Sequence, residues 1–203
     1  MNKSIIFVRV ATKADAKYAG EIVLETQKSA LLRGSGISKR TPVSIAEKMS
    51  AGKAVIAVTA SGEWVGFSYY ESWQNNTFIS NSGLIVAPKF RHSGVAKSIK
   101  NRVFSLSRRM YPNAKIFSIT SGAAIMKMNS QLGFEPVTYA QITQDMTFWE
   151  GCKSCVNHAI LESKNKNNCL CTAMLFSPEH IDQIIASAEN TLQLKQNLNL
   201  KNI

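Results

Sequence analysis

The sequence has little that would place the protein in a membrane or outside the cell. Its longest apolar runs, such as residues 84–87, are far shorter than the roughly 20 residues of a membrane-spanning helix. The residues after Met1 lack the long apolar core of a signal peptide. We therefore expect a cytoplasmic protein with no membrane partner. There the four cysteines should be reduced or metal-bound rather than paired in disulfides.

Acidic residues are also scarce. The 203-residue chain has 13 Asp and Glu against 24 Lys and Arg, a formal net charge of +11. Such an excess can mark nucleic-acid binding, but the basic residues are dispersed rather than clustered. We expect no nucleic-acid partner, and we assign the excess to a polyanionic ligand or to solubility. The length and a hydrophobic content of 45% fit one domain with a sizeable core.

The most informative stretch, residues 81–100, runs from a hydrophobic strand through a basic turn into a helix. Pro88 ends the strand because its nitrogen cannot donate a hydrogen bond to a neighbouring strand. After the turn, apolar residues recur at helical spacing and basic residues fall mostly elsewhere on the helical wheel. The apolar positions are Val95, Ile99, Val103, Leu106 and Met110, and the basic ones are Lys97, Lys100, Arg102, Arg108 and Arg109.

The turn itself, residues 91–96, should bind an anion. Backbone N–H groups at a helix N-terminus lack partners within the helix, and the helix dipole is positive there. The Arg91 guanidinium adds a charge, and the small residues Gly94 and Ala96 let a diphosphate approach the backbone. The stretch therefore predicts a phosphate-binding site.

These residues resemble a known motif. Val86-x-Pro88-x-Phe90-Arg91-x-x-Gly94-Val95-Ala96 is similar to the coenzyme A pyrophosphate loop of the GNAT acyltransferase superfamily, (Arg/Gln)-x-x-Gly-x-(Gly/Ala). The order of elements agrees, and Leu132-Gly133-Phe134 resembles the family's helix-to-strand junction. The resemblance covers about residues 5–136. It implies an α/β (α+β) fold with a mixed, mostly antiparallel seven-stranded sheet flanked by helices.

Patterning places the expected elements and domains. Strands are predicted at 5–10, 53–59, 64–73, 77–86, 115–120, 134–138 and 169–176, and helices at 14–30, 42–50, 95–110 and 123–132. We expect an acyltransferase domain over 1–177, which includes a cysteine-containing insertion at 139–172, followed by a C-terminal helix and tail at 178–203.

The resemblance implies an N-acyltransferase with acetyl-CoA as cosubstrate, in which an amine attacks the thioester directly. Backbone N–H groups at a splayed strand end are then expected to hold the pantetheine and polarise the carbonyl. The residues expected to bind the cosubstrate are Leu84, Ile85, Val86, Arg91, His92, Ser93, Gly94, Val95 and Ala96.

Two residues are the catalytic candidates. In a regular strand Glu71 shares a face with Tyr69 and Trp73, and partial burial there would raise its pKa and make it a general base. The alternative is a solvated carboxylate near a strand end. Asn129 occupies the position of a family tyrosine that protonates the departing thiolate. An amide can hydrogen-bond a thiolate but does not readily donate a proton to it, so the identity of the acid is open.

The four cysteines, Cys152, Cys155, Cys169 and Cys171, form a Cys-x-x-Cys and a Cys-x-Cys pair. Together they suggest a structural zinc site, with His158 as a substitute ligand. Buried unreactive thiols and a redox pair are the alternatives.

The basic loop at residues 33–40 is the expected binding site for the acceptor, whose carboxylates would pair with Arg33, Lys39 or Arg40. The alternative is a charged loop that is simply solvated. The whole chain is similar to a bacterial subgroup associated with arginine biosynthesis. This implies a small-molecule amine acceptor such as glutamate. A protein N-acyltransferase, a non-catalytic CoA-binding regulatory module and a homodimer stay open.

Overall fold

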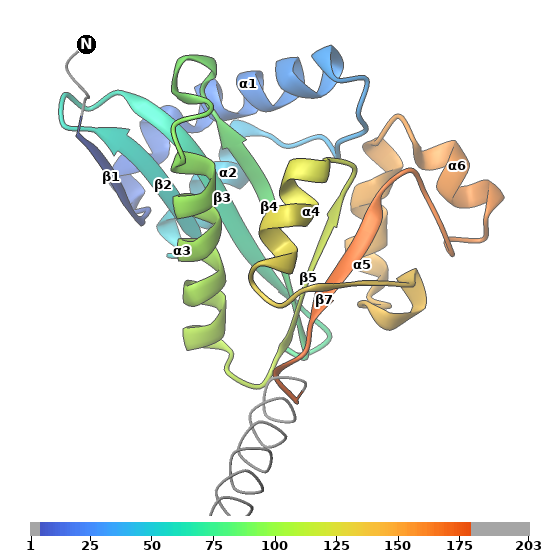
Figure 1. Ribbon diagram of the computed structural model, residues 1–203. Helices are drawn as coiled ribbons and strands as arrows, with labels where there is room; N and C mark the ends of the chain where they lie inside the picture. Colours follow the sequence, from blue (N-terminus) through green and yellow to red (C-terminus); the bar gives the residue numbers. More distant parts are fainter. Residues whose placement is uncertain (1–4, 180–203) are drawn as a thin grey trace, which may run out of the picture.

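The computed structural model describes residues 5–179, so the expected C-terminal helix and tail lie outside the described residues from residue 180 onward. The described chain forms one seven-stranded sheet in the order β1-β2-β3-β4-β5-β7-β6 (Figure 1). Only β4 and β5 are parallel neighbours, which confirms the mostly antiparallel sheet. The strands are β1 (Ile6–Val10), β2 (Ala54–Thr59), β3 (Trp64–Trp73), β4 (Phe78–Val86), β5 (Lys115–Thr120), β6 (Glu135–Val137) and β7 (Thr172–Phe176).

Helices cover both faces of the sheet. Two of them, α3 (Val95–Met110) and α4 (Ala123–Ser130), lie on one face, and α1 (Ala19–Leu32) and α2 (Pro42–Ser50) lie on the other (Figure 1). The short helices α5 (Met146–Glu150) and α6 (His158–Ser163) stand beside β7. No helix within residues 5–179 is long and apolar enough to cross a membrane. Four 3-10 helices complete the described chain: Lys13–Tyr18, Pro88–Phe90, Tyr139–Gln141 and Gly151–Ser154.

Local chemistry explains several boundaries. The side chain of Thr41 accepts a hydrogen bond from the Ser44 N–H at 3.1 Å, so Thr41 caps α2 ahead of Pro42, as the sequence predicts. The short strand β6 contains Pro136, which is tolerated because β6 lies at the edge of the sheet. The first predicted helix begins later than expected, at Ala19, because residues 13–18 form a 3-10 helix.

The helix α3 packs its apolar face into the main core, as predicted, and Val95, Ile99, Val103 and Leu106 are buried. One residue of the basic set departs from the prediction. Lys100 is only 2% exposed, although the helical wheel places it with the polar residues. The Phe134 ring, whose centroid lies 5.0 Å from Nζ, covers it.

The sheet opens between β4 and β5. Their parallel pairing extends only from Phe78 with Lys115 to Ser80 with Phe117, and both strands continue beyond it. We call the space between residues 81–86 of β4 and 118–120 of β5 the wedge. On its other side β4 carries a β-bulge, with a register shift against β3. Gly83 has φ +66° in this bulge, and a Cβ there would lie 2.6 Å from the Tyr69 ring.

Candidate active site

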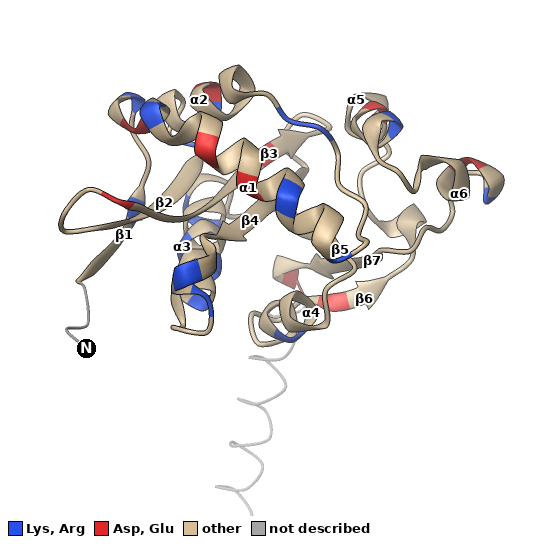
Figure 2. Cartoon of the chain, turned by 90° about the horizontal axis from the view of Figure 1, so that it is seen from above, with Lys and Arg blue, Asp and Glu red and all other residues tan. Residues whose placement is uncertain are grey.

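The turn before α3 has the geometry of an anion-binding site. Gly94 caps the helix in the left-handed conformation, with φ +85°, and no atom lies within 4 Å of the position that a Cβ would occupy. The N–H groups of the first helical turn therefore face an open approach. The helix carries five Lys and Arg residues and no Asp or Glu, and it is marked only in blue in Figure 2.

Arg91 ties this turn to neighbouring elements. Its Nη2 donates to Glu25 Oε1 at 2.6 Å and to Ser29 Oγ at 2.7 Å, both on α1. Its Nε donates to the Val86 carbonyl oxygen at 3.2 Å. His92 and Ser93 are exposed beside it, and His92 has φ +61°. The structure thus gathers the predicted loop residues at the helix N-terminus, while their contact with a diphosphate stays a prediction.

The backbone of β4 faces the wedge. The Ala87 N–H donates to the Val65 carbonyl oxygen at 2.9 Å, and Ile85 is paired with Phe67. Because backbone groups alternate sides along an antiparallel pair, the N–H and C=O of Val86 point away from β3 and toward the wedge. This is the splayed strand end that the sequence predicts, with Leu84 in the adjacent bulge.

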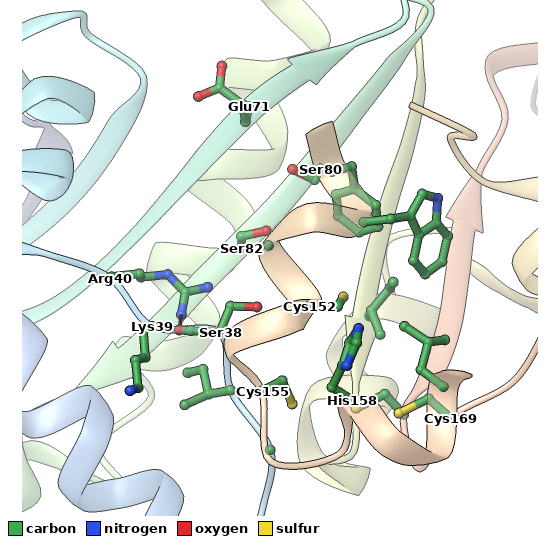
Figure 3. A pocket seen from close by; sticks show the side chains of 18 of the residues that line it. Ser38, Lys39, Arg40, Glu71, Ser80, Ser82, Cys152, Cys155, His158 and Cys169 are labelled. Carbon is green, nitrogen blue, oxygen red and sulfur yellow. Dashed lines mark hydrogen bonds between the residues drawn. The ribbon is translucent and has the colours of Figure 1, made fainter. Parts of the chain in front are cut away.

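A cavity of about 380 Å³ lies on the face of the wedge opposite α3. Three walls meet there: the loop before α2, the strands β3 to β5, and the cysteine segment (Figure 3). Ser80 and Ser82 line the cavity from β4, and Phe117 and Ile119 line it from β5. The cavity therefore opens onto the wedge, across the sheet from the anion-binding turn.

Solved acetyltransferase structures share this fold. N-acetylglutamate synthase from Neisseria gonorrhoeae, complexed with coenzyme A and N-acetyl-glutamate, gives a TM-score of 0.60 at 11% identity, covering 87% of this chain and 36% of its own. A GNAT superfamily phosphinothricin acetyltransferase from Sinorhizobium meliloti, in complex with AcCoA, gives 0.55 at 15%, covering 85% and 88%. The fold is that of the GNAT acetyltransferases. Their shared GNAT fold confirms the fold that the sequence motif implies.

A third GNAT-like structure is diaminobutyrate acetyltransferase EctA from Paenibacillus lautus, complexed with its substrate L-2,4-diaminobutyric acid and coenzyme A. It gives a TM-score of 0.55 at 12% identity, covering 87% of this chain and 96% of its own. This chain spans only about a third of the Neisseria synthase. No family model and no curated protein matches the sequence.

Glu71 lies in the cavity wall on β3 together with Tyr69 and Trp73, as predicted. It forms ion pairs with Lys48 and, at 2.5 Å, with Lys53. Burial alone raises the pKa of Glu71, but hydrogen bonds from the two lysines outweigh burial and hold the pKa below its usual value. The predicted upward shift is therefore wrong, and Glu71 is a carboxylate at neutral pH.

Two of the three residues predicted to bind the acceptor, Lys39 and Arg40, line the cavity, and their contact with an acceptor stays a prediction. Arg40 donates from Nε to the Tyr69 hydroxyl at 2.9 Å and from Nη1 to the Ser38 carbonyl oxygen at 3.0 Å. Its guanidinium points into the cavity in Figure 3, whereas the Lys39 side chain runs the other way along the rim. Arg33 is exposed at the end of α1 and does not line the cavity, so the geometry gives its predicted role no support.

Asn129 is fully buried on α4, and its Nδ2 contacts Met174 Sδ at 3.5 Å. Its Oδ1 has no hydrogen-bond partner. Asn129 does not line the cavity. The structure therefore does not place it in contact with the acceptor, and its role toward a thiolate stays a prediction.

All four cysteines border the cavity, and their thiols are free. Within residues 5–179, no group of three or more His, Cys, Asp or Glu is placed to hold a metal ion, so zinc has no structural support. The backbone of Asn157 lies between two of the sulfurs: its N–H donates to Cys155 Sγ at 3.5 Å, and its carbonyl lies 4.0 Å from Cys169 Sγ. Burial, and then neighbouring cysteines, raise the pKa of Cys152 to about 11 and that of Cys171 to about 12. These features fit unreactive thiols that form part of the cavity wall.

Sequence reasoning missed the partners of Glu71. Lys48 lies on α2 and Lys53 immediately before β2, and neither stands out in the sequence. A signal was available for Lys53, because the strand it precedes was expected to neighbour the strand that carries Glu71. The Tyr70 N–H indeed donates to the Lys53 carbonyl oxygen at 2.9 Å.

Proposed function

We propose that this protein transfers an acetyl group from acetyl-CoA to the primary amine of a small amino-acid-like acceptor, such as glutamate. The observation that carries the proposal is the cavity, which presents the cation of Arg40 and the carboxylate of Glu71 beside the wedge, opposite the anion-binding turn. The carboxylates of an amino acid complement Arg40 and Lys48, which both line the cavity, and its amine would lie near Glu71. A diphosphate at the turn and a thioester in the wedge would bring the acetyl carbon to the mouth of the cavity.

Arg40 is suited to a carboxylate of the acceptor. Two of its N–H donors are used to hold the guanidinium in place, which leaves others for a paired contact with a carboxylate. The cavity is closed on one side by the cysteine segment, so it favours a small acceptor over a peptide. Two neighbours also support an amino-acid acceptor, since one was solved with N-acetyl-glutamate and another with diaminobutyric acid.

Glu71 is proposed to receive the amine proton. An acceptor ammonium attracted to this carboxylate must lose its proton before its nitrogen can attack. Because the lysines lower the pKa of Glu71, the carboxylate is a weak base that passes the proton on to water rather than keeping it. The Val86 N–H, directed into the wedge, is proposed to polarise the thioester carbonyl.

The test is release of CoA from acetyl-CoA, and then from succinyl-CoA, over a panel of free amino acids that includes glutamate, ornithine and diaminobutyrate. The proposal predicts saturable turnover with at least one of these acceptors. The control is the Arg33→Met variant, which removes a cation outside the cavity and should behave like the wild type.

Two other functions are distinguishable in the same assay. Turnover only with a peptide amine would favour a protein N-acyltransferase. CoA binding without turnover on any amine would favour a non-catalytic regulatory module. Either result would contradict the proposed acceptor.

A further inference from the structure

The residue that the proposed chemistry leaves unused is Lys100. It is 2% exposed, and its Nζ lies over the Phe134 ring, 5.0 Å from the ring centroid. No hydrogen bond or ion pair within residues 5–179 offsets the cost of burying this amine. Burying a lysine without an ion-pair partner lowers the stability of the fold, which suggests that Lys100 has a chemical role.

The position of Lys100 along β4 follows from two contacts between α3 and the sheet. Asn81 Nδ2 donates to Ser107 Oγ at 2.8 Å, which fixes Ser107 beside Asn81. At the other end, a Cβ on Gly66 would lie 2.6 Å from Ile99 Cδ1 and 3.3 Å from Val86 Cγ2, so Ile99 lies beside Val86. The helix α3 thus runs antiparallel to β4.

Lys100 precedes Ser107 by two helical turns, about 10 Å along the axis. That distance equals about three strand residues, which puts Lys100 level with Leu84. Leu84 belongs to the part of β4 that borders the wedge. The contact with Phe134 then turns the side chain of Lys100 from α3 toward the α4 side, which is the β5 side of the wedge. Asn129 Oδ1, which is buried and has no hydrogen-bond partner, lies on α4 at the same junction, where Asn129 O accepts from the Phe134 N–H at 3.1 Å.

We propose that Lys100 is the general acid of the reaction and protonates the departing thiolate of CoA. The inference rests on the proposed acetyl transfer. The acceptor nitrogen attacks the thioester carbon from the cavity, the C–S bond breaks, and its electron pair stays on sulfur. The Lys100 ammonium gives a proton to that sulfur, which yields CoA thiol and a neutral amine. Water then returns a proton to the amine.

The electrostatics of the site agree with this role. Burial lowers the pKa of Lys100 to about 7, below that of a free thiol at about 8.5, so proton transfer to the thiolate is downhill. No charged neighbour contributes to this shift. The titratable residues on the surrounding elements are Lys97, Arg102, Arg108 and Arg109 on α3, Tyr69, Tyr70 and Glu71 on β3, Lys115 on β5, Lys127 on α4 and Glu135 on β6, and β4 has none.

The decisive experiment uses free CoA as the probe and needs no acceptor. The ultraviolet absorbance of the thiolate is titrated with pH for CoA bound to the wild type and to Lys100→Met, with desulfo-CoA as the blank. The Lys100 ammonium and the bound thiolate stabilise each other and titrate as a coupled pair, so the apparent pKa of CoA bound to the wild type should be lower than that of free CoA. Lys100→Met should return it to the ordinary value or above. An unchanged pKa in the variant would overturn the proposal.

Turnover supplies the second readout. Lys100→Met should lower kcat about a hundredfold and remove the decline of kcat above pH about 7, while the Kd of desulfo-CoA stays within about twofold. Arg102→Met, an exposed change on the same helix, should alter neither. An equal loss of CoA and desulfo-CoA affinity, with an unchanged pH profile, would show a binding role only and overturn the proposal. If the wild type turns over no amine, the proposed function fails, and the thiolate titration still decides whether Lys100 faces the sulfur.

Discussion

A half-buried carboxylate, Glu71, and a buried amine, Lys100, lie on opposite faces of the sheet, and their surroundings have opposite effects on their charged forms. Glu71, on the cavity side, is held by Lys48 and Lys53, and its charged form is stabilised. Lys100, on the α3 side, has no counter-charge, and its charged form is destabilised. We infer that the two sides have different roles. Residues on the cavity side orient a charged acceptor, and Lys100 on the α3 side donates a proton to the leaving thiolate.

Glu71→Gln should produce the largest change. The amide keeps the shape of the side chain but neither attracts an ammonium nor receives its proton. We expect kcat/KM for the acceptor to fall about a hundredfold or more, with the affinity for CoA unchanged. Steady-state kinetics and calorimetric titration with CoA measure the two quantities. Unchanged turnover would remove Glu71 from the mechanism.

Lys100→Met should stabilise the fold. Because the pKa of Lys100 is about 7 in the folded chain and about 10.4 when unfolded, the wild type loses stability as pH falls from about 10 to about 7, and loses no more below that. The variant lacks this loss. At pH 7 its free energy of unfolding should exceed the wild-type value by an amount on the order of 4 kcal/mol, and the gap should close toward pH 10. Urea unfolding across this range tests it, with Arg102→Met as the control.

Arg40→Met should weaken acceptor binding. Loss of a charged hydrogen-bond donor costs roughly 1.5–3 kcal/mol, so KM for the acceptor should rise about tenfold or more. The KM for acetyl-CoA should not change, since Arg40 lies in the cavity and not at the turn before α3. A rise in both KM values would mean that the variant has disturbed the loop as a whole.

Lys48→Met should raise the pKa of Glu71. With one counter-charge removed, burial is less compensated and the pKa of Glu71 rises. The acidic limb of the kcat/KM profile should therefore move to higher pH, measured against Glu47→Gln as a surface control on α2. An acidic limb that does not move would separate the pH dependence from Glu71.

The regions that the sequence predicts well are those with local causes. The bounds of β3 and β5 and the start of α3 follow from aromatic and β-branched residues, Pro88 and Gly94, which act on their own neighbours. The cavity depends instead on contacts between distant residues. Glu71 meets Lys48 from another element, and so burial alone gave the wrong direction for its pKa.

Lys100 illustrates the same limit on α3. It borders the apolar face, in line with Ser107, and a helical wheel cannot tell whether such a position is covered. Phe134, 34 residues further along the chain, covers it. Only the packing of α4 and the residues after it could reveal a buried amine.

The measurement that tests the account most directly is the product balance of the wild type. Acetyl-CoA is incubated with the amino-acid panel, and the N-acetyl product and free CoA are quantified by mass spectrometry. Acetyl transfer across the wedge predicts equal amounts of both products, with one acidic or diamino acid preferred. CoA that binds tightly but yields no N-acetyl product with any amine would contradict it.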